Sequence, residues 1–181
     1  MNKNTIKLNS SNIISIRKDL DNKITKYWHI IRNENVMSKK AISANLGSGL
    51  DLKALYNTIT QLQEKRIKIK GILVALNNGE TSFDFDKFKN TNNYSIYAAG
   101  EAKEAIAQLK MVPTINPTEK SKKGSKNLSK TETFTSAKIA QLIKDLQLKA
   151  NKYDTNLADF NNNTEIDIAG CSNDFEDYLT V

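Results

Sequence analysis

The sequence predicts an all-α protein: an elongated helical bundle of about four main helices, with a disordered basic loop and an acidic C-terminal tail. Four segments repeat their apolar residues at steps of three and four, the spacing that places side chains on one face of an α-helix. Residues that cap or break helices flank these segments. At 181 residues the chain is long enough for one domain with a hydrophobic core and too short for two.

The first predicted helix runs from about Ser11 to Asn33, after N-cap candidates at 10–12. Trp28 lies beside its apolar stripe and widens it. Residues 38–45 could form one further short helical turn. The stripe consists of Ile13, Ile16, Leu20, Ile24, Tyr27 and Ile31.

The second predicted helix begins at the N-cap candidate Asp51 and ends at Asn77-Asn78-Gly79, because Asn and Gly adopt the left-handed backbone that closes helices. Its apolar stripe consists of Leu52, Leu55, Ile59, Leu62, Ile69, Leu73 and Leu76. A β-hairpin with strands at 72–76 and 81–85 is an alternative, since Asn-Gly is a strong hairpin signal. The unbroken stripe favours the helix.

The third and fourth helices are predicted in the second half of the chain. The third spans about 93–111 and is closed by Pro113, with Ile96, Ala99, Ala102, Ile106 and Leu109 on one face. The fourth starts after Thr133 or Thr135 and ends at Asn161-Asn162-Asn163. Its apolar face consists of Ile139, Leu142, Leu146, Ala150, Tyr153, Leu157 and Phe160.

Arg66 stands in the stripe of the second helix where an aliphatic residue is expected. Its guanidinium could reach solvent at the edge of the stripe while its methylene groups pack on apolar neighbours. Alternatively, Arg66 is a structural residue that pairs with a buried acid such as Asp145 or Asp154 and fixes the register of the bundle.

Two stretches are predicted to be unstructured and to contact partners. Residues 117–130 hold five lysines and one glutamate, too little apolar surface to order themselves. Residues 161–181 contain five acids and no base, so the rest of the chain carries a net charge of +12. The predicted domains are a bundle at 1–164, including the flexible basic loop, and an acidic tail at 165–181. The expected contact residues are Phe175, Tyr178 and Leu179 in the tail and Lys120, Lys122, Lys123 and Lys126 in the loop.

The net charge of +7 is compatible with a nucleic-acid partner, because a basic surface attracts phosphate. The chain has only 3 Arg against 24 Lys. Since Arg grips phosphate and guanine bidentately, its scarcity argues against a sequence-specific reader. Lysines spread along helices favour a solvated surface over a nucleic-acid surface.

Motifs with chemical meaning are few. Cys171 and His29 are the only residues of their kinds, too few for a structural zinc site, and the acids near Cys171 disfavour its thiolate. Asp84-Phe85-Asp86 resembles a metal-binding DxD triplet outside any βαβ pattern, and Gly47-Ser48-Gly49 lacks the lysine that cradles phosphate. We therefore expect no catalytic, cofactor-binding or metal-binding residues.

The sequence also predicts a cytoplasmic protein without membrane contact. No stretch approaches the ~20 apolar residues of a membrane span. Residues 1–10 lack the apolar core of a secretory signal. The abundance of Lys, Asn and Ile is typical of A/T-rich genomes and fits a bacterium, its phages or its mobile elements.

Three features form a layout between Tyr27 and Glu165: a helix that ends near Asn33-Glu34-Asn35, a helix from Leu52 through Lys65-Arg66, and a last helix that closes between Asp154 and Asn161 before Thr164-Glu165. This layout resembles the septicolysin-like family of small bacterial helical proteins. The chain departs from the family where it has Arg66-Ile67 in place of Arg-Asp and Asn161-Asn162 in place of Asn-Trp. The resemblance implies a helical bundle and no activity.

These observations favour a non-enzymatic structural or assembly protein that acts through protein–protein contacts, consistent with a phage or mobile-element origin. Two alternatives stay open. Lysines clustered on one folded face would favour a nucleic-acid-associated protein. Two inward acids that face each other from different helices would favour an enzyme whose site is assembled from scattered carboxylates.

Overall fold

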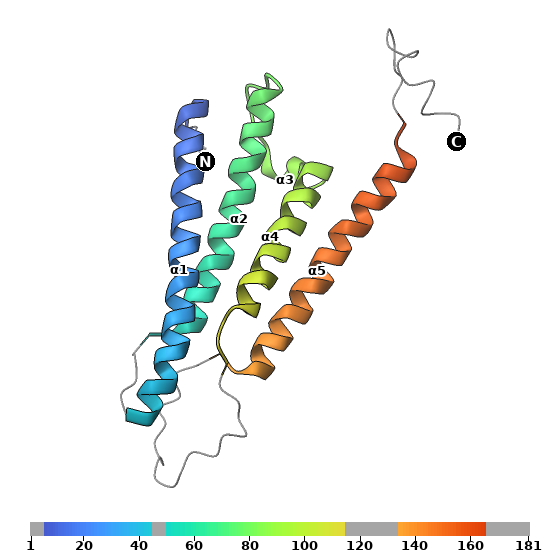
Figure 1. Cartoon of the computed structure of the whole chain (residues 1–181). Helices are drawn as coiled ribbons and strands as arrows, with labels where there is room; N and C mark the ends of the chain where they lie inside the picture. The colour runs from blue at the N-terminus through green and yellow to red at the C-terminus, as the bar shows by residue number, and fades with distance from the viewer. Residues whose placement is uncertain (1–5, 45–49, 115–133, 166–181) are drawn as a thin grey trace, which may run out of the picture.

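The computed structural model describes residues 6–44, 50–114 and 134–165 (Figure 1). Within these ranges the chain is all-α, as predicted, with no β-strand. The helices are α1 (Ser10–Ala44), α2 (Leu52–Asn77), α3 (Phe85–Phe88), α4 (Asn92–Lys110) and α5 (Ser136–Asn163).

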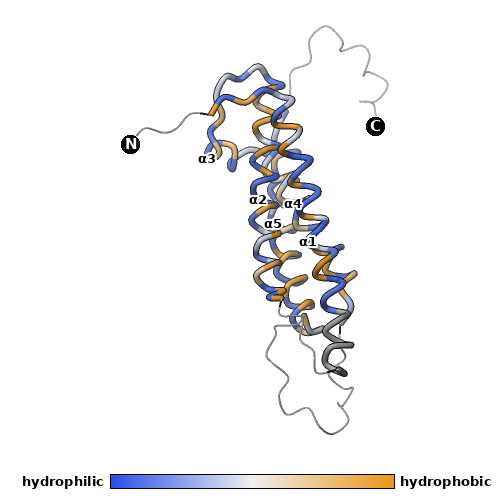
Figure 2. Tube along the Cα trace, turned by 90° about the vertical axis from the view of Figure 1, so that its left-hand side faces the viewer, coloured by the Kyte–Doolittle hydropathy of each residue, from blue (hydrophilic) through white to orange (hydrophobic). Residues whose placement is uncertain are grey.

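The four long helices α1, α2, α4 and α5 lie side by side and alternate in direction (Figure 1). α1 packs mainly on α2, and α4 packs mainly on α5, while a smaller contact between α2 and α4 joins the two pairs. Figure 2 shows the same elongated body from the side, with hydrophobic positions recurring along each helix. We call the end where α2 and α5 begin the basal end and the opposite end the distal end.

Helix α1 is longer than predicted. It continues through Asn33 and the segment 38–44 to Ala44, where the sequence suggested an end near Asn33 and a separate turn. No glycine or proline occurs between Ser10 and Ala44, so nothing in the backbone chemistry stops the helix earlier.

Helix α2 confirms the predicted bounds, and the hairpin alternative is wrong. The Asp51 side chain accepts a hydrogen bond from the backbone N–H of Ala54 at 3.0 Å and caps the N-terminus. At the other end, Gly79 adopts φ +77° and donates to the carbonyl of Leu76, while Glu80 donates to that of Ala75. This pair of bonds is a Schellman motif. The Asn-Gly dipeptide therefore terminates α2 and does not form a hairpin turn.

The bounds of α4 and α5 differ from the predicted ones by one or two residues. Threonine caps both N-termini: the hydroxyl of Thr91 accepts from the N–H of Tyr94, and that of Thr135 accepts from the N–H of Lys138. The additional single-turn helix α3 begins at Asp84, whose carboxylate accepts from the N–H groups of Asp86 and Lys87. The first Asp of the triplet Asp84-Phe85-Asp86 is therefore a helix cap.

Apolar side chains form two clusters along the bundle axis. All four long helices contribute to the larger, basal cluster, which buries Ile24, Trp28, Ile31, Leu52, Ile59, Ala105, Leu109, Val112, Phe134 and Ile139. The smaller cluster is aromatic, lies toward the distal end, and combines Ile67, Phe88 and Ala98 with Phe83, Phe85, Tyr94, Tyr97 and Tyr153.

The face of α2 that is buried differs from the predicted stripe. Ile59, Gln63, Ile67, Gly71 and Ala75 are buried at steps of four, whereas most of the predicted stripe residues are half-buried. Likewise Ile96, predicted to face inward from α4, is 49% exposed. Both helices have two neighbours, and a single stripe does not describe a helix that packs on two sides.

Candidate functional site

A buried charge network at the middle of the bundle is centred on Arg66. Arg66 is 7% exposed and Glu101 of α4 is 5% exposed. The guanidinium Nε donates to Glu101 Oε1 at 2.8 Å, and Nη2 donates to Oε2 of the same carboxylate. This bidentate pair is the geometry in which Arg and a carboxylate interact most strongly.

Further partners surround this pair. Arg66 Nη1 donates to Asp21 of α1 at 2.8 Å, and Nη2 also donates to Glu104 of α4 at 2.6 Å. Lys70 Nζ donates to Glu101 Oε1 at 3.1 Å. The network therefore connects α1, α2 and α4 through one guanidinium, at the level where the two helix pairs meet.

The electrostatics of Arg66 favour its charged form. Burial lowers the pKa of the guanidinium, but hydrogen bonds to Glu101 and Asp21 and the charge of Glu104 outweigh burial, so the pKa lies above its ordinary value. Asp21 and Glu101 are acids that converge from different helices. Because both bind a permanently charged arginine, their arrangement is that of a structural ion network and not that of an acid–base pair.

The partners suggested for Arg66 from the sequence were wrong. Asp145 accepts from Gln141 on its own helix at 2.8 Å, and Asp154 pairs with Lys103 at 2.8 Å. The reason is the order of the helices, since α5 packs on α4 while Arg66 faces α1 and α4. The alternative prediction, that the Arg66 guanidinium reaches solvent at the edge of the stripe, is also wrong, because Arg66 is buried.

A second buried polar group, Asn35, organises the basal end. Its side chain is fully buried, and its Nδ2 donates to the carbonyls of Pro113 and Phe134, the latter at 3.2 Å. Its Oδ1 accepts from the backbone N–H of Phe134 at 3.0 Å. Asn35 thus fixes α1 to the backbone on both sides of the segment 115–133, and three backbone groups that would otherwise lose their partners are satisfied.

The distal cluster combines aromatic rings with lysines. The Lys68 and Lys89 ammonium groups lie 4.5 Å and 4.7 Å from the ring centroid of Phe85, and Lys70 lies 5.4 Å from that of Tyr97. These distances allow cation–π attraction. Burial raises the pKa of the Tyr153 hydroxyl, and its hydrogen bond with Tyr94 raises that pKa further.

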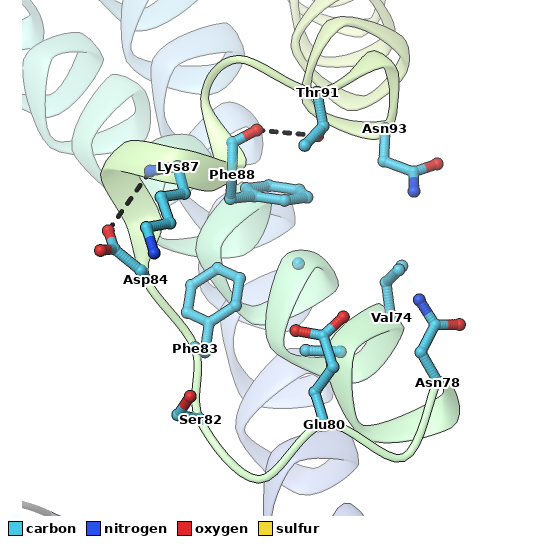
Figure 3. A pocket seen from close by; sticks show the side chains of 12 residues that line it. Val74, Asn78, Glu80, Ser82, Phe83, Asp84, Lys87, Phe88, Thr91 and Asn93 are labelled. Carbon is cyan, nitrogen blue, oxygen red and sulfur yellow. Dashed lines mark hydrogen bonds between the residues drawn. The ribbon is translucent and has the colours of Figure 1, made fainter.

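A pocket of about 320 Å³ lies beside this cluster, between the end of α2, α3 and the start of α4 (Figure 3). Its lining combines apolar residues such as Val74 and Phe88 with polar ones such as Asn78 and Asn93. The Asp84 carboxylate caps α3 by accepting a hydrogen bond from the N–H of Asp86. The side chain of Asp86, which does not line the pocket, pairs with Lys89 at 3.1 Å. Nowhere in the part of the chain that the structure describes do three or more potential metal ligands gather. The lining residues are Gly71, Val74, Ala75, Asn78, Glu80, Ser82, Phe83, Asp84, Lys87, Phe88, Thr91 and Asn93.

All seven residues that the sequence singled out for partner contacts lie outside the described residues. They are Lys120, Lys122, Lys123, Lys126, Phe175, Tyr178 and Leu179, and Cys171 and Gly47-Ser48-Gly49 also lie there. His29 is exposed on α1, with its Nδ1 3.2 Å from Nη2 of Arg32.

Sequence reasoning missed Asn35, Glu101 and the aromatic cluster. Asn35 and Glu101 carry no local signal, because their partners are 78–99 and 35 residues away in the chain. The aromatic cluster had a signal, since residues 83–97 contain five aromatic residues and no other stretch of this length contains as many.

None of the helices within the described ranges is long and apolar enough to cross a membrane. No family model, curated protein or solved structure matches this chain significantly. The resemblance to the septicolysin-like family therefore stays a prediction.

Proposed function

We propose that this chain is a non-enzymatic structural or assembly protein that self-associates through helix faces. The observation that carries the proposal is the apolar face of α5, which continues beyond the part that the bundle covers. Apolar residues recur at steps of four and three at Ile139, Ile143, Leu146, Ala150, Tyr153, Leu157 and Phe160.

The last residue of this face is the exposed one. Phe160 is 44% exposed, whereas the residues before it are buried or half-buried: Ile139 and Ala150 are buried, and Ile143, Leu146, Tyr153 and Leu157 are half-buried. In Figure 1 the C-terminal end of α5 leans away from the other three long helices. A continuous apolar face that loses its cover at one end is typical of a surface that packs against another protein.

The buried polar groups support a structural role. Arg66 and Glu101 are bound to each other, and Asn35 is bound to backbone groups. These groups hold helices and chain segments together, and none of them lines the pocket beside α3.

The proposal predicts that charges on the exposed end of the apolar face reduce self-association. Leu157→Glu/Phe160→Glu should lower the average mass measured by light scattering toward the 20.3 kDa of one chain, because buried carboxylates destabilise an apolar interface. Leu148→Glu is the matched control, since Leu148 is 62% exposed and lies nine residues from Leu157, on the opposite side of the helix. Equal masses for all three proteins would contradict the proposal.

A nucleic-acid-associated protein is the second candidate, and the distribution of lysines favours it. Basic residues gather toward the basal end, where Lys53, Lys110 and Lys138 lie on three different helices. If this second candidate is correct, the protein should bind DNA or RNA at physiological salt concentration. A fluorescence anisotropy titration with a labelled oligonucleotide measures this binding. Binding that vanishes at that salt concentration is the weak attraction that any lysine-rich surface shows for phosphate.

A further inference from the structure

The two ends of the elongated bundle differ in charge. In the basal half, the described residues 22–44, 50–64, 105–114 and 134–149 hold ten basic residues and four acids. Pro113 and Phe134, which flank the segment 115–133 in the sequence, both bind Asn35 at this end. By contrast, residues 150–181, the end of α5 and the segment that follows it, hold seven acids and one lysine.

Each end combines its charge with exposed apolar residues. At the basal end, Leu50 is 41% exposed and Met111 is 52% exposed, close in sequence to Lys53 and Lys110. At the other end, Phe160 is exposed on α5. In the sequence it is followed by the acidic segment, which contains Phe175, Tyr178 and Leu179. The basal end and the acidic segment are therefore opposite in charge, and both contain apolar residues.

The length of the chain disfavours contact between the two ends of one molecule. The 28 residues of α5 span about 42 Å from the basal end to Asn163. Phe175 is 12 residues beyond Asn163 and reaches at most about 40 Å from it when fully extended. Returning Phe175 to the basal end of its own molecule would require an almost straight chain laid along α5, at a large loss of conformational entropy. A second molecule can present its basal end without this restriction.

We propose that the acidic segment 165–181 of one copy, together with the uncovered end of α5 that precedes it in the sequence, binds the basal end of a second copy, near Lys53, Lys110 and Lys138, so that copies join head to tail. The proposal rests on the self-association proposed above and names its partner and direction. The two contacting surfaces differ, so the contact is heterologous, and nothing in it limits the assembly to two copies. The assembly therefore grows with protein concentration and weakens with salt.

The experiment compares full-length variants by sedimentation velocity at low ionic strength and again at about 0.5 M salt, where charges are screened. The acidic-segment variant carries Glu165→Gln, Asp167→Asn, Asp174→Asn, Glu176→Gln and Asp177→Asn. The basal variant carries Lys53→Glu, Lys110→Glu and Lys138→Glu. The matched control carries Lys18→Glu, Lys65→Glu and Lys152→Glu, three exposed lysines outside the basal end with the same change in charge.

The unmodified protein and the control should form species that grow with concentration at low ionic strength. The acidic-segment variant and the basal variant should each sediment as single chains. An equimolar mixture of these two variants should form complexes of two chains and nothing larger, because each variant retains the surface that the other has lost. Circular dichroism spectra equal to that of the unmodified protein show that the variants are folded.

Several outcomes would overturn the head-to-tail contact while leaving self-association intact. One is a closed dimer whose mass is constant over concentration and salt. A second outcome combines two results: the acidic-segment variant assembles as much as the unmodified protein does, and Leu157→Glu/Phe160→Glu does not assemble. A third is an acidic-segment variant with unchanged mass and new, salt-resistant DNA binding, which would assign the basal end to nucleic acid. A single-chain unmodified protein at every concentration would contradict self-association itself.

Discussion

At the scale of single residues, the fold depends on two buried polar groups with distant partners. Arg66 connects three helices, and Asn35 fixes the base of the lysine-rich segment to α1. A buried charge without its partner is strongly destabilising, whereas replacing both partners by apolar residues often is not. This asymmetry makes the role of the Arg66–Glu101 pair measurable.

Arg66→Met should lower the free energy of unfolding by about 3–5 kcal/mol, because it leaves the buried Glu101 carboxylate with the Lys70 ammonium as its one remaining charged partner among the described residues. Arg66→Met/Glu101→Met should recover most of that loss, since it removes both buried charges. Urea denaturation measures both values. A loss below about 1 kcal/mol in the single variant would mean that the network does not hold the helices together.

The sequence indicated that Arg66 is unusual but could not identify its partners. Choosing between Asp145, Asp154 and Glu101 requires the order in which helices pack, and that order depends on contacts between residues far apart in the chain. Asn35 was not identified at all. A polar residue inside a helix is normally solvent-exposed, and only the position of Phe134 shows that this one is buried.

At the scale of helices, the bounds of α2, α4 and α5 could be predicted because their ends are determined locally. Asp51, Thr135 and Gly79 act through hydrogen bonds or backbone angles that involve residues at most five positions away. The extension of α1 and the existence of α3 could not be predicted in this way. No strong stop signal falls at the end of α1, and α3 is a single turn whose Phe88 packs on α2.

Gly71 is the position where this packing is closest. A Cβ atom at Gly71 would lie 2.7 Å from Cε1 of Phe88 and 2.9 Å from Cζ of Phe83. Gly71→Ala should therefore destabilise the protein by about 1–3 kcal/mol despite the higher helix propensity of Ala. In the control, Gly100→Ala in α4, a Cβ meets no atom within 4 Å, and stability should rise by about 0.5–1 kcal/mol. Thermal unfolding of both variants tests the contrast, and equal shifts in the same direction would contradict it.

At the scale of the whole molecule, the all-α class and the elongated form were predictable because regular apolar spacing requires helices that pack along their length. The division into two helix pairs joined by a small contact between α2 and α4 was not predictable. The alternating directions of the helices place the N-termini of α2 and α5 at the basal end and the C-terminus of α5 at the opposite end.

Self-association is the central claim, and the sedimentation of the unmodified full-length protein over a wide concentration range tests it most directly. If copies join as proposed, the average mass should rise above the 20.3 kDa of one chain as concentration increases, because the uncovered end of α5 then packs on another molecule. It should fall again when salt is added, since salt screens the charges of both ends. A constant mass of one chain at every concentration and salt would contradict the claim.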